Sequence, residues 1–402
     1  GRPPVVLWHG LANRSCTFVC NNIRSHNLAL VLADAGYDVW LPNTRMHRLA
    51  RCFRGPGGDN GAAAWDWDIE DLATDDFPAV LEYIRIVTQW ERVTYLGYSQ
   101  GACLALMGLA LKPELNNSLR CCVALAAALK PQPSCSRIIN TFLHVARPGR
   151  VYSLVPGRGG FMLVSEWLEA SCHAFVMVVL MSLTFLTFFA WTGSRWRPFH
   201  RRAAFMTHTF GANSTRGVVH WLQIIAAQRF IPYQPTRGGW PTSLDGPERE
   251  RIAHAPEYDL SAITAPLWVA MSRTDPMSDV DWTRARLPPH AQYHLLEGYE
   301  HMDILWADDA PRDVFRPLLA YLAAQHVDVA HRLGRPQAAS HGGKAGGAKR
   351  GGAHGAAASV LATGDLASPS SEPWPWPALG TRARPHPARL SRRAHHHRSV
   401  HA

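Results

Sequence analysis

The sequence predicts an α/β fold with a mostly parallel central sheet and helices on both faces. Three observations support this prediction. Short apolar runs alternate with amphipathic helical segments, the alternation is interrupted once before it resumes, and polar residues of the kind used in catalysis follow several apolar runs. Strands that alternate with helices are joined by crossovers and lie parallel. We therefore expect one core, built from two parts of the chain with an insert between them.

The first part of the core, residues 1–129, is predicted to hold four strands. The opening run PPVVLWHG is apolar and ends in glycine, as a buried parallel strand does. A helix follows in SHNLALVLADAG and stops at Gly36, and Tyr37 to Leu41 form the second strand. The amphipathic helix IEDLATDDFPAVLEYIRIVT leads to the third strand, ERVTYLG. The buried helix ACLALMGLAL leads to the fourth, CCVALAAAL.

Residues 130–260 are predicted to form an inserted cap, because prolines, glycines and mixed helical pieces replace the alternation. The core resumes over residues 261–326, where APLWVAMSRTDP and AQYHLLEGYEHMD predict strands and PRDVFRPLLAYLAAQ a closing helix. Within the insert, residues 174–193 are largely apolar, uncharged and long enough to span a membrane. A membrane span at these residues would force both parts of the core to lie against the bilayer. We expect a cap helix that contacts lipid, and the membrane span stays open as the alternative.

The formal net charge of +10 is concentrated at the carboxyl end. From Arg332 onward, eleven Lys and Arg residues stand against Asp365 and Glu372, so residues 1–331 are close to neutral. A neutral body argues against a nucleic-acid-binding fold, and we expect no specific nucleic-acid binding. Residues 327–402 are rich in Gly, Ala, Pro, Arg and His and lack helical periodicity, which predicts a disordered tail.

No metal or organic cofactor is predicted. The eight cysteines show no C-x-x-C spacing, so a structural zinc site is not expected, and buried thiols are the expectation. The chain opens at Gly1 without methionine or a signal-like segment. We expect that N-terminal strands and any targeting segment are missing from it. The compartment and the oligomeric state stay open.

The most informative motif is GYSQG, a G-x-S-x-G pattern at residues 97–101. A serine between two glycines, where a strand becomes a helix, predicts a sharp turn that exposes the hydroxyl. Ser99 is therefore the candidate nucleophile. An oxyanion needs two backbone N–H donors, for which Gln100 and, in the HGLAN loop after the first strand, Leu11 are the candidates. The pattern is short and needs partners elsewhere in the chain.

The second part of the core supplies these partners. A serine nucleophile needs a base that is held by a carboxylate, and in such sheets the order along the chain is Ser, Asp or Glu, then His. SRTDPMSD follows one strand and offers Asp275, with Asp279 as the alternative, and GYEHMD follows the next and offers His301. Both segments lie at carboxyl ends of parallel strands, where such sheets place their sites. Asp303 is interpreted as a helix N-terminal carboxylate.

These motifs resemble the acid lipase family, which includes gastric and lysosomal acid lipases and steryl ester hydrolases. The resemblance covers roughly residues 3–324 and rests on PPVVLWHGLA, LADAGYDVWLPNTR, WDIEDLATDDFPAVLEYI, GYSQG, SRTDPMSDVDW and YEHMDILWADDAPRDVF. The most specific parts are LADAGYDVW with Asn43 and Arg45, and the H-x-D-x-x-W-x-x-D-A-P pattern from His301 to Pro311.

The resemblance implies an α/β-hydrolase fold with an inserted helical cap and lid, which favours the lid interpretation of residues 174–193. It also favours Asp275 over Asp279. The family usually has histidine before its nucleophile, where this chain has Tyr98; that departure would alter the pocket without removing a catalytic group. The family's catalytic and oxyanion-binding residues match five positions of this chain: Ser99, Asp275, His301, Leu11 and Gln100.

The expected function is hydrolysis of carboxylic esters of neutral lipids, either triacylglycerols or steryl esters, through an acyl-enzyme intermediate. The lipid preference follows from the apolar cap and the resemblance, since the three side chains alone imply only ester chemistry. Two alternatives stay open: a lipid acyltransferase that uses the same residues, and an inactive protein that binds lipid or membranes. The expected partners are a neutral lipid ester and a lipid surface. The expected setting is a membrane, a lipid droplet, or a secretory or lysosomal compartment.

Overall fold

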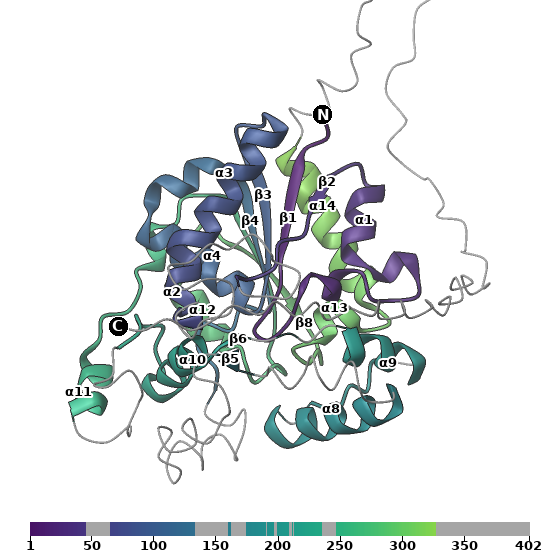
Figure 1. Cartoon of the computed structure of the whole chain (residues 1–402). Coiled ribbons are helices and arrows are strands. Elements are labelled where there is room, and N and C mark those ends of the chain that lie inside the picture. Colours follow the sequence, from purple (N-terminus) through teal and green to yellow (C-terminus); the bar gives the residue numbers. More distant parts are fainter. Residues whose placement is uncertain are drawn as a thin grey trace, which may run out of the picture. The chain divides into compact units, whose positions relative to one another are not determined.

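A computed structural model describes both predicted parts of the core and the helices of the insert (Figure 1). The described residues are 1–45, 65–132, 160–161, 174–189, 191–196, 199–208, 211, 213–234 and 247–326. All of them belong to the unit Gly1–Lys349. The predicted disordered tail, residues 327–402, lies outside the described residues.

Six parallel strands form the central sheet, in the order β2-β1-β3-β4-β7-β8. Their bounds are Pro4–Trp8 for β1, Asp38–Trp40 for β2, Val93–Tyr98 for β3, Leu119–Leu125 for β4, Leu267–Ser272 for β7 and Gln292–Leu296 for β8. The chain runs outward from β1 to β2 and then returns to place β3 on the other side of β1. Loops that leave β1 and β3 therefore meet at the carboxyl edge, where open α/β sheets bind ligands.

Each face of the sheet packs against its own hydrophobic core, because successive side chains of a strand point to opposite faces. Val6 belongs to one core and its neighbour Leu7 to the other. The first face is covered by α2 (Ile69–Asp71), α3 (Phe77–Thr88), α4 (Gln100–Leu111) and α12 (Val280–Arg286). The second is covered by α1 (Leu28–Asp34), α13 (Asp303–Trp306) and α14 (Arg316–Gln325). The predicted α/β architecture with helices on both faces is confirmed.

The helix expected from the IEDLATDDFPAVLEYIRIVT segment differs from a regular α-helix in one respect. Residues Leu72–Asp76, between α2 and α3, form a π-helical turn. Pro78 has no N–H to donate to the carbonyl of Thr74, and the Lys112 ammonium donates to that carbonyl instead, at 2.7 Å. A distant lysine thus satisfies a backbone group that the proline leaves without its helical donor.

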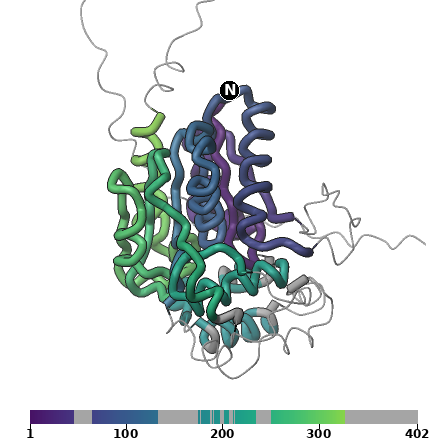
Figure 2. Tube along the Cα trace, turned by 90° about the vertical axis from the view of Figure 1, so that its left-hand side faces the viewer, coloured from purple at the N-terminus to yellow at the C-terminus, as the bar shows by residue number. Residues whose placement is uncertain are grey.

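The insert lies at the carboxyl end of the strands in both Figure 1 and Figure 2. Its elements are α8 (Ala174–Phe189), α9 (Phe199–His208), α10 (Thr215–Ala227), α11 (Pro247–His254), and the short antiparallel pair β5 (Gly160–Phe161) and β6 (Asn213–Ser214). Helix α8 takes up most of the apolar segment 174–193. Among the helices that the structure describes, none has the length and apolar character needed to cross a membrane.

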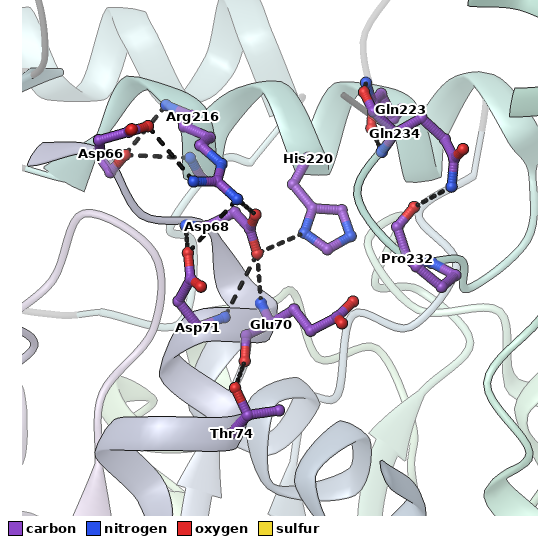
Figure 3. A network of polar contacts seen from close by, with 12 residues as sticks. Asp66, Asp68, Glu70, Asp71, Thr74, Arg216, His220, Gln223, Pro232 and Gln234 are labelled. Atoms are coloured by element: carbon purple, nitrogen blue, oxygen red, sulfur yellow. Dashed lines mark hydrogen bonds and ion pairs between the residues drawn. The ribbon is translucent and has the colours of Figure 1, made fainter. Parts of the chain in front are cut away.

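A buried polar network ties α10 of the insert to the amino end of α2 (Figure 3). Asp68 caps α2 and lies 2.7 Å from Nη2 of Arg216, and Nδ1 of buried His220 lies 3.6 Å from Asp68 Oδ1. Burial raises the pKa of Asp68, but His220 and Arg216 lower it by more, so the net shift is downward. This charged contact anchors one cap helix to the core.

Candidate active site

Ser99 lies at the junction between β3 and α4, in a backbone conformation that few residues other than glycine adopt. Its φ is 53° and its ψ is −116°. The turn is held in place from both sides: the Ser99 N–H donates to the carbonyl of Leu125 on β4, and the Ser99 carbonyl accepts from Ala102 and Cys103. The predicted sharp turn is present, and it places the serine at the carboxyl edge of the sheet.

The two glycines of GYSQG allow backbones to approach too closely for a side chain. A Cβ at Gly97 would lie 2.4 Å from the carbonyl carbon of Gly101, and a Cβ at Gly101 would lie 2.3 Å from the carbonyl oxygen of Trp8. Contacts of this length with backbone atoms cannot be relieved by a side-chain rotation. The glycines are therefore required for the close packing of α4 against β1 and β3.

Gly101→Ala is expected to destabilise the fold by about 3 kcal/mol or more, because the backbone must move to admit the methyl group. Urea denaturation followed by circular dichroism measures this loss. Gly217→Ala, within helix α10, is the matched control. A Cβ at Gly217 would meet its nearest neighbour, Asn213 Oδ1, at 3.4 Å, which is an ordinary contact distance. That variant is expected to be neutral or slightly stabilised. Equal stability of the two variants would contradict the packing argument.

His301 follows β8 and lies between the serine and a carboxylate. Its Nε2 is 2.8 Å from Ser99 Oγ, and its Nδ1 is 2.7 Å from Asp275 Oδ2. An ionised carboxylate only accepts hydrogen bonds, so we assign the proton to Nδ1, which leaves Nε2 to accept from the serine hydroxyl. Both contacts are buried, with Ser99 8% and His301 4% exposed, so they are less weakened by water than surface contacts.

Asp275 lies in the loop after β7 and is almost completely buried, at 1% exposure. Its Oδ1 accepts the N–H of Met277 at 2.9 Å, and Oδ2 lies 3.2 Å from the Ser278 hydroxyl as well as 2.7 Å from His301. These contacts hold the carboxylate facing the imidazole. Ser278 was not identified from the sequence, although an aspartate that accepts the N–H two residues later is a recognisable Asx turn.

The other two carboxylates considered from the sequence lie away from Nδ1 of His301. Asp279 caps α12 by accepting from the N–H of Trp282 and pairs with Lys130 at 2.7 Å. Asp303 is the first residue of α13, in agreement with its interpretation as a helix N-terminal carboxylate. Burial raises the pKa of Asp303 to about 6. The structure thus brings Asp275, and not these two, into contact with the imidazole.

The two predicted oxyanion residues are direct neighbours in the chain of Gly10 and Ser99. Leu11 follows Gly10, where a Cβ would lie only 3.4 Å from Ser99 Oγ, so the turn after β1 passes directly beside the serine. Gln100 is the first residue of α4, where backbone N–H groups carry partial positive charge. The Gln100 side chain is held by Trp221 of the cap, whose Nε1 donates to Oε1 at 2.8 Å. Nothing in the sequence pattern pointed to Trp221.

Within the part of the chain that the structure describes, no group of three or more His, Cys, Asp or Glu side chains is placed to hold a metal ion. The contacts described above have the geometry that a hydroxyl nucleophile, an imidazole base and an orienting carboxylate would require. Chemically it can support covalent catalysis at an acyl group.

Comparison with known proteins gives a consistent result. Residues 3–146 match the family model described as alpha/beta hydrolase fold. A Schizosaccharomyces pombe protein named Probable lipase C14C8.15 is 29% identical over 306 residues, which are 76% of this chain and 65% of that protein. Human gastric triacylglycerol lipase is 26% identical over 330 residues, 80% of each chain. The chain has the α/β-hydrolase fold and is similar in sequence to these lipases. A solved carboxylesterase structure from Nitrososphaera gargenis, 15% identical, has a TM-score of 0.46 and covers 81% of this α/β-hydrolase and 92% of its own chain.

This α/β-hydrolase spans 65% of the length of its S. pombe relative. It carries Tyr98 where the resemblance implied histidine. The Tyr98 hydroxyl lies 3.1 Å from the carbonyl oxygen of His301 and 2.9 Å from Sδ of Met302. Burial raises the pKa of this hydroxyl well above its usual value, so it stays protonated and can donate. Tyr98 therefore supports the loop that carries His301.

Proposed function

We propose that this chain hydrolyses carboxylic esters of neutral lipids, triacylglycerols or steryl esters, through an acyl-enzyme intermediate. The observation that carries the proposal is the unbroken hydrogen-bonded line from Asp275 through His301 to Ser99. The substrate class is supported by relatives that are named as a gastric triacylglycerol lipase and a probable lipase.

In the proposed reaction, Ser99 Oγ attacks the ester carbonyl while His301 Nε2 takes its proton, and Asp275 stabilises the imidazolium. The N–H groups of Leu11 and Gln100 donate to the oxyanion that forms on the carbonyl oxygen. Nε2 then returns the proton to the departing alcohol. A water molecule, deprotonated by the same nitrogen, attacks the acyl-enzyme and releases the fatty acid while Ser99 regains its proton.

The outer face of α8 is the proposed contact with a lipid surface. One side of this helix packs into the second core through Val178 and Phe185. The opposite side leaves a row of apolar side chains in solvent, between 40% and 58% exposed, which are Phe175, Val176, Val179, Leu180, Leu183 and Leu186. An apolar row of this length on a surface helix is typical of a protein that adsorbs to lipid.

Replacing Leu183 and Leu186 together by glutamate is expected to lower hydrolysis of emulsified triolein by about tenfold or more. Each leucine would otherwise transfer apolar surface from water to lipid, worth on the order of 1 kcal/mol for its exposed half. Hydrolysis of soluble p-nitrophenyl butyrate should stay within about twofold. The matched control is the double change of Ile86 and Val87 to glutamate on α3, at similar exposure but outside the cap. Equal losses on triolein from both pairs would contradict a specific role of α8.

The direct test is to supply the purified chain with p-nitrophenyl butyrate, triolein and cholesteryl oleate and to measure fatty acid release. Cleavage of a long-chain ester supports the proposal and identifies the lipid class. A sterol ester that accumulates at the expense of fatty acid, after addition of cholesterol as acceptor, would favour the acyltransferase alternative. If the folded chain releases no product and its Ser99 does not react with a fluorophosphonate, the inactive lipid-binding protein is favoured.

A further inference from the structure

A short segment of the cap, Trp191–Trp196, lies against the loop that carries His301; we call it the strap. It stands between α8 and α9 in the chain. The strap turns at Gly193, where φ is +58° and a Cβ would meet the ring of Trp196 at 3.0 Å. The proposed reaction leaves it without a role.

Glu300, which precedes His301, holds the first half of the strap. The backbone N–H of Thr192 lies 2.9 Å from both carboxylate oxygens, and the Thr192 hydroxyl donates to Oε1 at 2.7 Å. The N–H of Gly193 donates to Oε2 at 2.9 Å. A single carboxylate thus receives three donors from two adjacent residues. Hydrogen bonds to a charged acceptor are stronger than those between neutral groups.

Two further side chains fasten the second half of the strap to the same region. Arg195 donates to the carbonyl of Gly298 at 3.0 Å and pairs with Asp309 at 2.7 Å. Trp196 donates from Nε1 to Asp303 at 2.7 Å. Four of the six strap residues are therefore hydrogen-bonded to residues between 298 and 309.

The result of this attachment is an aromatic stack on the imidazole. The Trp191 ring lies 5.2 Å from the His301 ring, centroid to centroid, with the planes 10° apart. Phe189 of α8 stacks on the same indole at 4.4 Å and 16°. Trp191 is buried, and its Nε1 has no hydrogen-bond partner among the described residues. Trp191 therefore contributes its ring surface, and α8 is connected to the imidazole through two stacked rings.

We propose that Trp191 is a positioning residue for His301 and that Glu300 sets the position of Trp191 by holding the strap. The imidazole must present Nε2 to Ser99 and Nδ1 to Asp275 at the same time. The torsion that rotates a histidine ring has broad minima, so contacts on the ring face restrict it. This inference rests on the proposed function, and it adds that the placement of α8 is coupled to the reactivity of the triad.

The test compares Trp191→Ala, Trp191→Phe and Glu300→Gln by steady-state kinetics on soluble p-nitrophenyl butyrate and by the rate at which a fluorophosphonate labels Ser99. Trp191→Ala should lower kcat and the labelling rate by about 10- to 100-fold, because a small misplacement of a catalytic group has effects of this size. KM should change by less than about threefold. Trp191→Phe keeps a stacking ring and loses no hydrogen bond, so it should stay within about threefold of wild type.

Glu300→Gln replaces one acceptor oxygen by an N–H donor that faces the strap, and it should lower kcat by about tenfold. The control is Glu297→Gln, which removes the same charge from an exposed side chain of the same loop and should leave kcat unchanged. Because Glu300 acts through Trp191, the double variant Trp191→Ala/Glu300→Gln should be no slower than Trp191→Ala alone. Thermal unfolding checks that each variant is folded. If Trp191→Ala does not fold, the test is the comparison of the single variants Trp191→Phe and Glu300→Gln.

Full activity of folded Trp191→Ala would overturn this inference, and so would additive losses in the double variant. An increase in kcat would show that the strap obstructs the site, and would also overturn it. In each of these cases the wild type remains active and the proposed hydrolysis stands. A folded wild type that neither cleaves ester nor reacts with the fluorophosphonate would remove the proposed function and this inference together.

Discussion

Ser99→Ala is expected to reduce ester hydrolysis by at least about 10⁴-fold while the chain stays folded. The change removes the oxygen that would attack the ester, and the other members of a catalytic triad do not compensate for a missing nucleophile. The fold should survive because the contacts that shape the turn are made by the backbone of residue 99, which donates to Leu125 and accepts from Ala102 and Cys103. Rates on p-nitrophenyl butyrate, together with circular dichroism, measure both effects.

A matched control for this variant is Ser25→Ala. Ser25 is exposed and is distant in sequence from the β3–α4 junction that holds Ser99. It should leave the rate unchanged. Ser99→Ala should also abolish labelling by a fluorophosphonate, whereas the control should be labelled normally. Residual hydrolysis within tenfold of wild type would remove Ser99 from the proposed mechanism.

Asp275→Asn is expected to lower kcat by about 10⁴-fold with little change in KM. The amide nitrogen of asparagine can donate to Nδ1 of His301, which favours the tautomer with its proton on Nε2. In that tautomer Nε2 no longer accepts from Ser99, although the geometry of the three side chains is preserved. The loss is therefore one of proton transfer and not of substrate binding, and a comparison of kcat with KM separates the two.

Asp279→Asn is the matched control for Asp275→Asn, four residues away. Asparagine still caps α12, and the exchange removes only the ion pair with Lys130, which is partly exposed. The cost in stability should be less than about 1 kcal/mol, and kcat should stay within about twofold. A loss from Asp279→Asn as large as that from Asp275→Asn would show that the orienting carboxylate has been wrongly assigned.

Most strands of the core were predictable because they are buried on both faces. The runs that contain β1, β3, β4 and β7 are almost continuously apolar, and a parallel sheet covered by two layers of helices requires this. The π-helical turn at Leu72–Asp76 was not predictable. The carbonyl of Thr74 in this turn accepts from Lys112, which is distant in sequence and approaches the turn only in the folded chain.

The candidate site, too, was predictable from the sequence only in part. The glycines beside Ser99 and the order of serine, aspartate and histidine along the chain identified three strand-end loops. Pattern alone left Asp275 and Asp279 open, and the resemblance to acid lipases favoured Asp275. The structure places Asp275 against His301 and Asp279 against Lys130. The catalytic roles of these residues remain predictions for the variants described above.

The sequence by itself determined the fold class, the strand-to-helix turn at Ser99 and the set of candidate side chains, since all of these depend on local periodicity and backbone geometry. Only the tertiary structure decided which carboxylate meets the imidazole and which side chains support it. Trp191 belongs to this second group, since it precedes Glu300 by 109 residues and is brought to Glu300 and His301 only by packing of the cap on the core. Side-chain packing between distant segments leaves no periodic signal in a sequence, because any residue of suitable shape can make the contact.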